Sequence, residues 1–97
     1  PDGQILPGLH SLVDRMQIRS MDLYETLMEA NRISNVTNRR DRCEAITRAI
    51  NICDQLLNYI ELSINLELLA DKSAEYWSKM VRDVKYMSIA WRKSERQ

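Results

Sequence analysis

The chain has 97 residues, of which 44% are hydrophobic and 29% charged, and its 14 basic side chains balance 14 acidic ones. This mixture is typical of a single globular domain covering residues 1–97 and excludes an intrinsically disordered chain. A net charge of zero argues against a protein whose whole surface is basic for nucleic-acid binding. No apolar run approaches the ~20 residues that cross a bilayer, so we expect no membrane association.

All glycines and prolines lie at the start of the chain, at positions 1, 3, 7 and 8. Residues 9–97 lack the two residue types that punctuate hairpins and sharp turns. The sequence therefore predicts an all-α fold, an antiparallel up-down helical bundle with short polar connections. Because the chain begins with Pro1 and not with Met, we expect further residues upstream in the native protein.

The first helix is predicted over residues 9–34, after an entry turn at Pro7-Gly8. Its apolar side chains recur at steps of three or four residues, which is the spacing of one helix face. A cluster of Ser, Asn and Thr at residues 34–38 then predicts a corner, because these side chains compete for backbone hydrogen bonds.

The second helix is predicted over residues 38–69 and has a broad apolar face. A seam with heptad spacing runs beside a second apolar line. The seam comprises Ile46, Ile50, Cys53, Leu57, Ile60 and Ile64, and the line comprises Ala49, Ile52, Leu56, Tyr59 and Leu66. A face of this width predicts contact with more than one neighbouring helix.

The third helix is predicted over residues 73–93, with Ser73 as its N-cap. We expect Trp77 and Trp91 to lie in the core or in a subunit contact, and Tyr86 to be exposed. Three helices of this kind leave apolar surface uncovered. We expect either a fourth helix, from residues upstream of Pro1, or another subunit to cover it.

The chain offers little for catalysis or metal binding. His10 is the only histidine, and even if it shares a helix face with Asp14, two ligands do not define a metal site. Cys43 and Cys53 lie ten residues apart in one predicted helix, about 15 Å along its axis, which is too far for a disulfide. Free thiols indicate a reducing compartment, so we expect a cytoplasmic protein. Because the chain shows no catalytic or metal-binding motif, we also expect no cofactor, no metal and no catalytic residues.

Basic residues that are distant in sequence are predicted to meet at one end of the bundle. In an up-down-up arrangement, the end of the first helix, the start of the second and the end of the third share a pole. This basic pole comprises Arg32, Arg39, Arg40, Arg42, Arg92, Lys93 and Arg96, with Arg48 one or two turns further along. Such a surface can bind phosphates or an acidic partner.

An alternative without function remains open for the same residues. Cations late in the third helix complement the helix dipole, whereas cations at a helix start, such as Arg39 and Arg40, do not. The basic pole is therefore either a binding surface or a solvated corner. Acidic residues gather at the opposite end, at Glu61, Glu67 and Asp71.

Residues 22–94 resemble a family of small bacterial four-helix-bundle proteins. The segment Asp22–Asn31 is similar to the second helix of that family, Ile60–Leu69 to the end of its long third helix, and Tyr76–Lys93 to its final helix. In the last segment, Met87 and Trp91 stand where the family tends to have Met and Trp. The family includes the accessory variability determinant of diversity-generating retroelements and proteins encoded within intervening sequences of large ribosomal RNA genes.

The resemblance implies a homo-oligomer, a barrel-like pentamer of helical bundles. It also implies a non-catalytic accessory protein that binds RNA or DNA, or a reverse transcriptase, during mutagenic complementary-DNA synthesis. The alternative function is a protein-only interaction module, such as an adaptor, chaperone or antitoxin whose exposed helix face receives another helix. A helical nuclease is disfavoured because the chain has one histidine.

Overall fold

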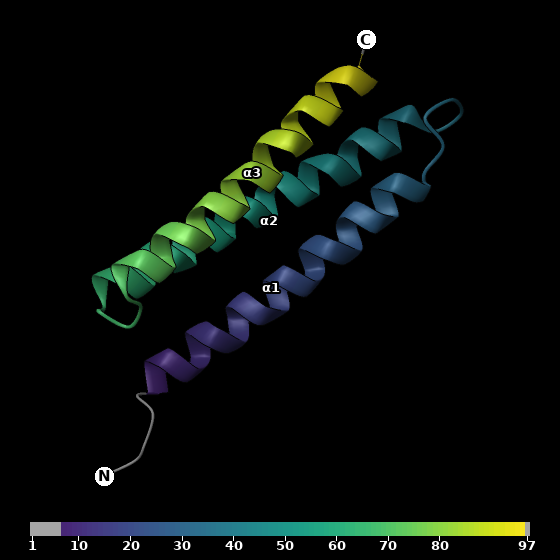
Figure 1. Cartoon of the computed structure of the whole chain (residues 1–97). Helices are drawn as coiled ribbons and strands as arrows, with labels where there is room; N and C mark the ends of the chain where they lie inside the picture. The colour runs from purple at the N-terminus through teal and green to yellow at the C-terminus, as the bar shows by residue number, and fades with distance from the viewer. Residues whose placement is uncertain (1–6, 97) are drawn as a thin grey trace.

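The computed structural model describes residues 7–96, and the side chains of residues 11–96. Three α-helices account for nearly all of this stretch: α1 (Pro7–Arg32), α2 (Arg39–Asn65) and α3 (Asp71–Glu95). Figure 1 shows them running alternately up and down, as the absence of Gly and Pro after residue 8 predicts. None of the described helices is both long and apolar enough to span a bilayer.

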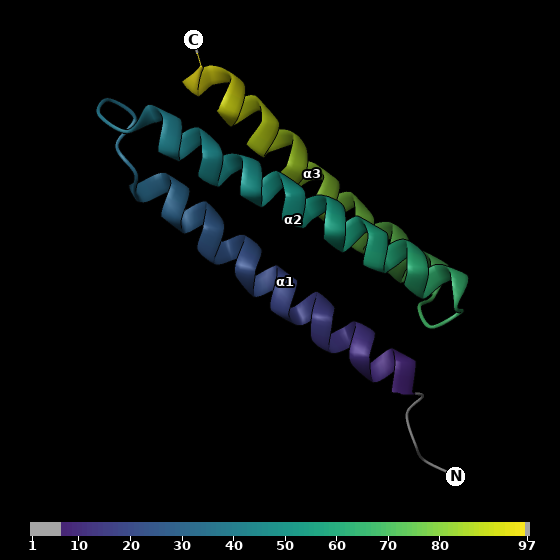
Figure 2. The same cartoon turned by 180° about the vertical axis from the view of Figure 1, so that it is seen from behind.

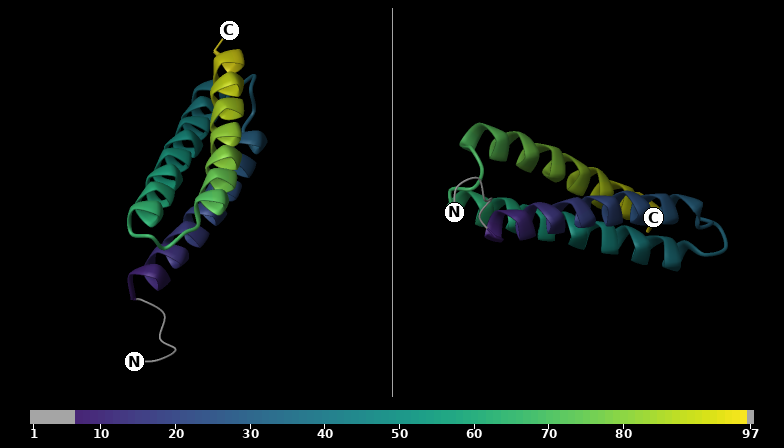
Figure 3. Two further views of the ribbon diagram at one scale, coloured as in Figure 1. Left: turned by 60° about the vertical axis from the view of Figure 1, so that its left-hand side comes forward. Right: turned by 90° about the horizontal axis from the view of Figure 1, so that it is seen from below.

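Helix α2 lies between the other two and contacts both along their length (Figures 1 and 2). Within residues 7–96, no Cα atom of α1 comes within 8 Å of α3. The views in Figure 3 show that α3 stands out of the plane shared by α1 and α2. The molecule is therefore an open trough, 58 × 20 × 13 Å, in which α2 forms the base and α1 and α3 form the walls.

The central place of α2 follows from its broad apolar face. Both predicted lines contribute buried residues to the core, and α2 contacts both α1 and α3. The buried apolar residues of α2 are Ala45, Ile46, Ala49, Ile50, Ile52, Cys53, Leu56 and Ile60. Toward the end of the helix this burial is lost, and Ile64 and Leu66 from the two predicted lines are exposed.

A cluster of buried core residues lies near the end where α1 leads into α2. Ala30 and Ala45 are fully buried there, and small side chains let the two helix axes approach closely. Ile46 and Ile50 pack beside them, and α3 closes the cluster with Ile89 and Trp91. Trp91 is thus a core residue, one of the two outcomes that the sequence analysis offered for it.

Polar contacts at the edges of the trough hold each wall to the base. Arg19 of α1 donates to Gln55 of α2 at 3.1 Å. On the other side, Lys85 of α3 lies 2.7 Å from Asp54 of α2, and this hydrogen bond raises the pKa of Lys85. Each pair thus joins one wall of the trough to the base.

The connection between α1 and α2 is organised by one serine. The Ser34 Oγ accepts hydrogen bonds from the backbone N–H groups of Val36 and Thr37, at 3.2 and 3.1 Å. Asn38 then donates its N–H to the carbonyl of Ser34 at 3.1 Å. The polar corner predicted at residues 34–38 is confirmed, with α1 ending two residues earlier than expected.

The end of α2 differs from the prediction by four residues. The helix stops at Asn65 and not at residue 69, because Glu67 adopts a left-handed conformation with φ of 57°. Glu67 N–H bonds to the carbonyl of Ile64 at 2.9 Å, and Leu68 N–H to that of Ser63 at 2.8 Å. This pair of bonds is a Schellman motif, and sequence analysis missed it because its left-handed position usually holds Gly.

The start of α3 also differs from the prediction. Ser73 was expected as the N-cap, but the helix begins at Asp71 and Ala70 occupies the N-cap position. Ala70 makes no side-chain capping bond. Asp71 instead places a carboxylate in the first turn, where the helix dipole favours negative charge.

Replacing Glu67 by Gly is expected to stabilise the protein by about 0.5–1 kcal/mol. A residue with a Cβ atom pays about 1–2 kcal/mol for the left-handed conformation, and Gly removes that cost while adding some backbone entropy to the unfolded chain. Urea denaturation followed by circular dichroism measures the change. Glu61→Gly, within helix α2, is the matched control and is expected to lose about 1 kcal/mol. Equal effects of the two substitutions would contradict the role assigned to Glu67.

Candidate nucleic-acid interface

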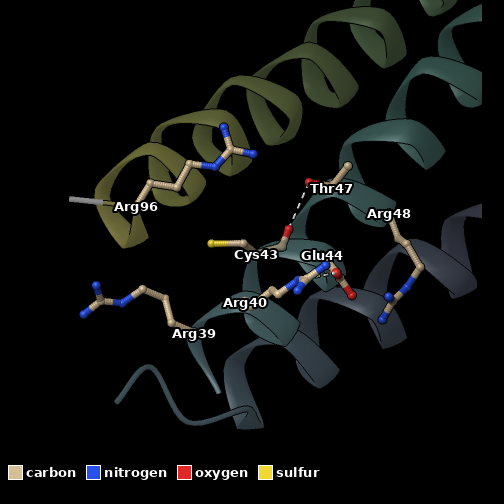
Figure 4. Close-up of a pocket in the computed structure, with 7 residues that line it drawn as sticks. All are labelled: Arg39, Arg40, Cys43, Glu44, Thr47, Arg48 and Arg96. Atoms are coloured by element: carbon tan, nitrogen blue, oxygen red, sulfur yellow. Dashed lines mark hydrogen bonds and ion pairs between the residues drawn. The ribbon is translucent and has the colours of Figure 1, made fainter. Parts of the chain in front are cut away.

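The basic pole predicted from the sequence forms around a groove between the start of α2 and the end of α3. Four arginines line it, with Glu44 as the only acidic side chain among its described lining residues. Figure 4 shows this set, which comprises Arg39, Arg40, Cys43, Glu44, Thr47, Arg48 and Arg96. Three successive turns of α2 supply the first six residues, and α3 supplies Arg96. Four cations against one anion give the groove a clear excess of positive charge.

Two of the arginines in the groove make ion pairs with neighbouring carboxylates. Arg40 Nε lies 3.4 Å from Glu44, one turn along α2. Arg48 reaches across to α1, where its Nη2 lies 3.1 Å from Glu29. All four side chains are more than half exposed, so water screens both pairs and each contributes little to stability.

Of the four groove arginines, Arg39 and Arg96 are the two with no acidic partner among the side chains of residues 11–96. Arg39 Nε makes one long contact of 3.4 Å to the backbone carbonyl of Asn35. In Figure 4 the two guanidinium groups lie on either side of the Cys43 side chain, one from each helix. Their charges are thus available to an anion that enters the groove.

The far wall of the groove is held by a polar contact between the helices. Arg92 Nη1 donates to the Thr47 hydroxyl at 3.1 Å, and Thr47 in turn donates to the carbonyl of Cys43 at 2.9 Å. Arg92 is half-buried by this contact. It therefore positions the end of α3 against α2, and with it the exposed Arg96.

The structure places the Arg42 side chain, which is only 14% exposed, against α3 and the end of α1. Its Nε lies 3.2 Å from Glu95 Oε1, its Nη1 donates to the carbonyl of Ile33 at 2.9 Å, and its guanidinium sits 5.0 Å from the centre of the Trp91 ring. Trp91 Nε1 donates to the same Glu95 oxygen at 3.1 Å. The Arg42 Nε–H itself is not aimed at an acceptor, so its contact with Glu95 is an ion pair without an aligned hydrogen bond.

Arg32 and Lys93 lie at the same end of the molecule but outside the groove. Arg32 lines a neighbouring hollow that it shares with Asp41 and Glu44, among other residues. Lys93 is exposed near the end of α3. The structure therefore brings Arg39, Arg40 and Arg96 together, with Arg32 and Lys93 at the margin and Arg42 and Arg92 engaged in packing.

Sequence analysis did not assign Cys43, Glu44 and Thr47 to the site. A usable signal was present, because they follow Arg39 and Arg40 at intervals of four residues and so share their side of α2. Both cysteines are free thiols. Cys53 is buried in the core, and burial raises the pKa of its thiol from 9.0 to about 11.

The described side chains include no group of three or more His, Cys, Asp or Glu residues that is placed to hold a metal ion. The side chain of His10, considered with Asp14 in the sequence analysis, lies outside the described residues. Comparison with models of protein families, with curated proteins and with solved structures found no match.

Proposed function

We propose that this protein is a non-catalytic accessory protein that binds a polyanion, RNA or DNA, through the groove between α2 and α3. The observation that carries this proposal is the pair Arg39 and Arg96. These exposed guanidinium groups come from two helices, border one groove and have no acidic partner among the described residues. Guanidinium groups that are not already paired are free to contact phosphate oxygens.

The helix dipoles account for some of the charge at this end but not for all of it. The C-terminal ends of α1 and α3 lie here, and cations such as Arg32 and Lys93 offset their negative ends. Arg39 and Arg40 occupy the positive end of α2, where a cation is unfavourable. Their presence there supports a binding role, because helix stability alone would favour acidic residues at these positions.

The sharpest version of the proposal comes from the resemblance of residues 22–94 to retroelement accessory proteins. In that version the protein associates with a reverse transcriptase and its nucleic acid, as a homo-oligomer. The groove supports the nucleic-acid part of this version. Contacts to phosphates need cations, which the groove has, and do not need a loop that reads the base sequence.

A second candidate function is a protein-only helical interaction module. The observation that favours it is the open side of the trough, where α1 and α3 expose apolar side chains and no Cα of one approaches the other within 8 Å. An amphipathic helix of another protein fits a surface of this kind. This function predicts no response to polyanions.

Titration of a fluorescently labelled structured RNA with the full chain tests the nucleic-acid proposal. The variant Arg39→Glu/Arg96→Glu is expected to weaken binding at low salt by about tenfold or more, since it removes two phosphate contacts and adds repulsion. The slope of log K against log salt concentration should also become shallower by about 1.5–2, because the variant forms two fewer phosphate contacts and its binding releases fewer counterions.

The matched control combines Arg82→Glu with Arg15→Glu. Arg82 is exposed on α3, about 21 Å along the helix from Arg96, and makes no ion pair with another described residue. A double change Arg15→Glu/Arg82→Glu equals the site variant in net charge and is expected to keep most of the affinity. If wild-type protein shows no salt-dependent binding, or if both double variants weaken binding equally, the groove is not the binding surface.

A further inference from the structure

The outer side of α3 carries cations that continue from the groove along the helix. Lys93 precedes Arg96 by three residues, so the two side chains are neighbours on the helix surface. Neither has an acidic partner among the described side chains. The only acidic residue at positions 84–96 is Glu95, which is 10% exposed and paired with Arg42. The positive charge of the groove therefore extends onto the outer side of α3.

An exposed aromatic ring stands on the same side of α3. Tyr86 is seven residues before Lys93, which is nearly two full turns, so the two side chains lie within about 20° of each other around the helix axis. Tyr86 is 60% exposed and lies about 15 Å along the helix from Arg96. Going away from the groove, α3 thus presents two cations and then a ring.

This side of α3 is continuous with the groove and separate from the trough. Lys85 and Arg92 are the residues of α3 whose side chains contact Asp54 and Thr47 of α2. Around the axis of α3, Arg96 falls about 20–40° beyond these two contacts, and the outer side lies about 60–80° further in the same direction. The side chains that line the trough fall on the opposite side of the helix.

The stretch of α3 without an exposed acid ends just beyond the ring. Asp83 precedes Tyr86 by three residues, and its side chain is 58% exposed although it pairs with Lys79 at 2.9 Å. An exposed carboxylate disfavours a phosphate beside it, because like charges repel. Arg82 lies beyond the ring, on the side away from the groove. The surface that suits a polyanion therefore runs from the groove to Tyr86.

We infer that the polyanion is a single-stranded nucleic acid, with its phosphates on Arg39, Arg96 and Lys93 and one base stacked on the ring of Tyr86. The inference rests on the proposed nucleic-acid function and names the class of nucleic acid. Cations bind the phosphates of a single strand and of a duplex alike. A ring on the protein surface stacks only on a base whose face is open, and in a duplex the neighbouring base pairs cover these faces.

The surroundings of the ring support a base as its partner. Surfaces that bind single strands combine a cationic track with exposed aromatic rings, which is the combination found from Arg96 to Tyr86. The other exposed tyrosine of α3, Tyr76, differs in both respects. It follows the acidic Glu75, and its ring is already engaged edge-on by Trp77 at a centroid distance of 5.6 Å.

Binding of three fluorescently labelled probes to the full chain tests the inference. Each probe is about 15 nucleotides long, within the range that one single-strand module covers. The first is an RNA strand of mixed sequence that does not pair with itself, the second is a duplex of the same length, and the third is a strand of the same length without bases. The wild type is expected to bind the first about tenfold more tightly than the third, because only the first can stack.

Substitutions separate the stacked base from the phosphate contacts. Tyr86→Ala is expected to weaken binding of the RNA strand about tenfold, and binding of the other two probes less than twofold. The slope of log K against log salt concentration should not change, because stacking releases no counterion. Tyr86→Phe keeps the ring and should bind as the wild type does. Lys93→Ala should weaken binding of the RNA strand and make the slope shallower by about 0.7, the value for one phosphate of a single strand.

Tyr76→Ala is the matched control, since Tyr76 is 61% exposed on the same helix but lies about 30 Å from Arg96. It should change the affinity for every probe less than twofold. If Tyr86→Ala weakens binding of all three probes equally, or no more than Tyr76→Ala does, the ring does not stack on a base. Should Arg39→Glu/Arg96→Glu still weaken binding in that case, only this inference is overturned and the groove stands. A wild type that binds none of the probes at low salt overturns both.

Discussion

Replacing Arg42 by Ala is expected to lower the free energy of unfolding by about 2–3 kcal/mol. The side chains of Arg42 and Glu95 are only 14% and 10% exposed, so the substitution leaves a carboxylate that is largely shielded from water without its cation. It also leaves the carbonyl of Ile33 without the Arg42 hydrogen bond and removes a cation from the face of Trp91.

Urea denaturation of Arg42→Ala, Glu95→Ala and the double variant measures this effect as a cycle. The double variant should lose less than the sum of the single variants, since removing Glu95 also removes the uncompensated charge. Arg82→Ala, at an exposed position, is expected to change stability by no more than about 0.5 kcal/mol. A loss below about 1 kcal/mol for Arg42→Ala would show that the ion pair is exposed to water in solution.

The Arg42 contacts also bear on the candidate binding surface. They join the start of α2, the end of α1 and the end of α3 at the end of the molecule where Arg39 and Arg96 lie. Without them, Arg92–Thr47 is the one described side-chain hydrogen bond that still joins the last turn of α3 to another helix. We therefore expect Arg42→Ala to weaken polyanion binding through the position of Arg96, although Arg42 itself does not reach the groove.

Truncating Ile46 to Ala is expected to cost about 3–4 kcal/mol, the largest effect of any substitution considered for this chain. Ile46 is fully buried at the point where all three helices meet, against Ala30 of α1 and Ile89 of α3. Its buried neighbours Ala30 and Ala45 are small side chains that cannot extend into the space left behind. The substitution therefore loses both transfer energy and packing contacts.

Thermal and urea denaturation of Ile46→Ala measure this loss. Val36→Ala removes two methyl groups at a position that is 83% exposed in the α1–α2 connection, and should change stability by no more than about 0.5 kcal/mol. A domain of this size has a free energy of unfolding of about 5–15 kcal/mol, so the expected loss in Ile46→Ala is a large fraction of the total. A change below about 1 kcal/mol would mean that the three helices do not converge on this residue.

The helical elements were predictable because their signals are local. Apolar side chains spaced three or four residues apart identified the faces of α2, and the polar residues 34–38 identified the first corner. The second corner was harder, because its left-handed position holds Glu67 and its N-cap holds Ala70. Neither residue is the one that intrinsic preference favours at its position, so the sequence carried no local signal for this corner.

The candidate site was predictable in part for a related reason. Up-down-up topology alone brings Arg39, Arg40 and Arg96 to one end, so helix order was enough to place them. Arg42 belongs to the same end, but its environment depends on Trp91 and Glu95, which arrive from a helix more than forty residues away. Whether a basic residue faces the groove or the core is set by such distant contacts.

The sequence by itself determined that the chain is all-helical, that α2 has two apolar lines, and that cations gather at one end. These properties follow from residue spacing along a single helix and from the position of Gly and Pro. Only the tertiary structure decided that α1 and α3 stand apart on either side of α2, that Arg42 is largely buried, and that Trp91 packs against the core whereas Trp77 is exposed. Residue spacing fixes where side chains lie around one helix axis, whereas the angle between neighbouring helices depends on how the side chains of both interlock.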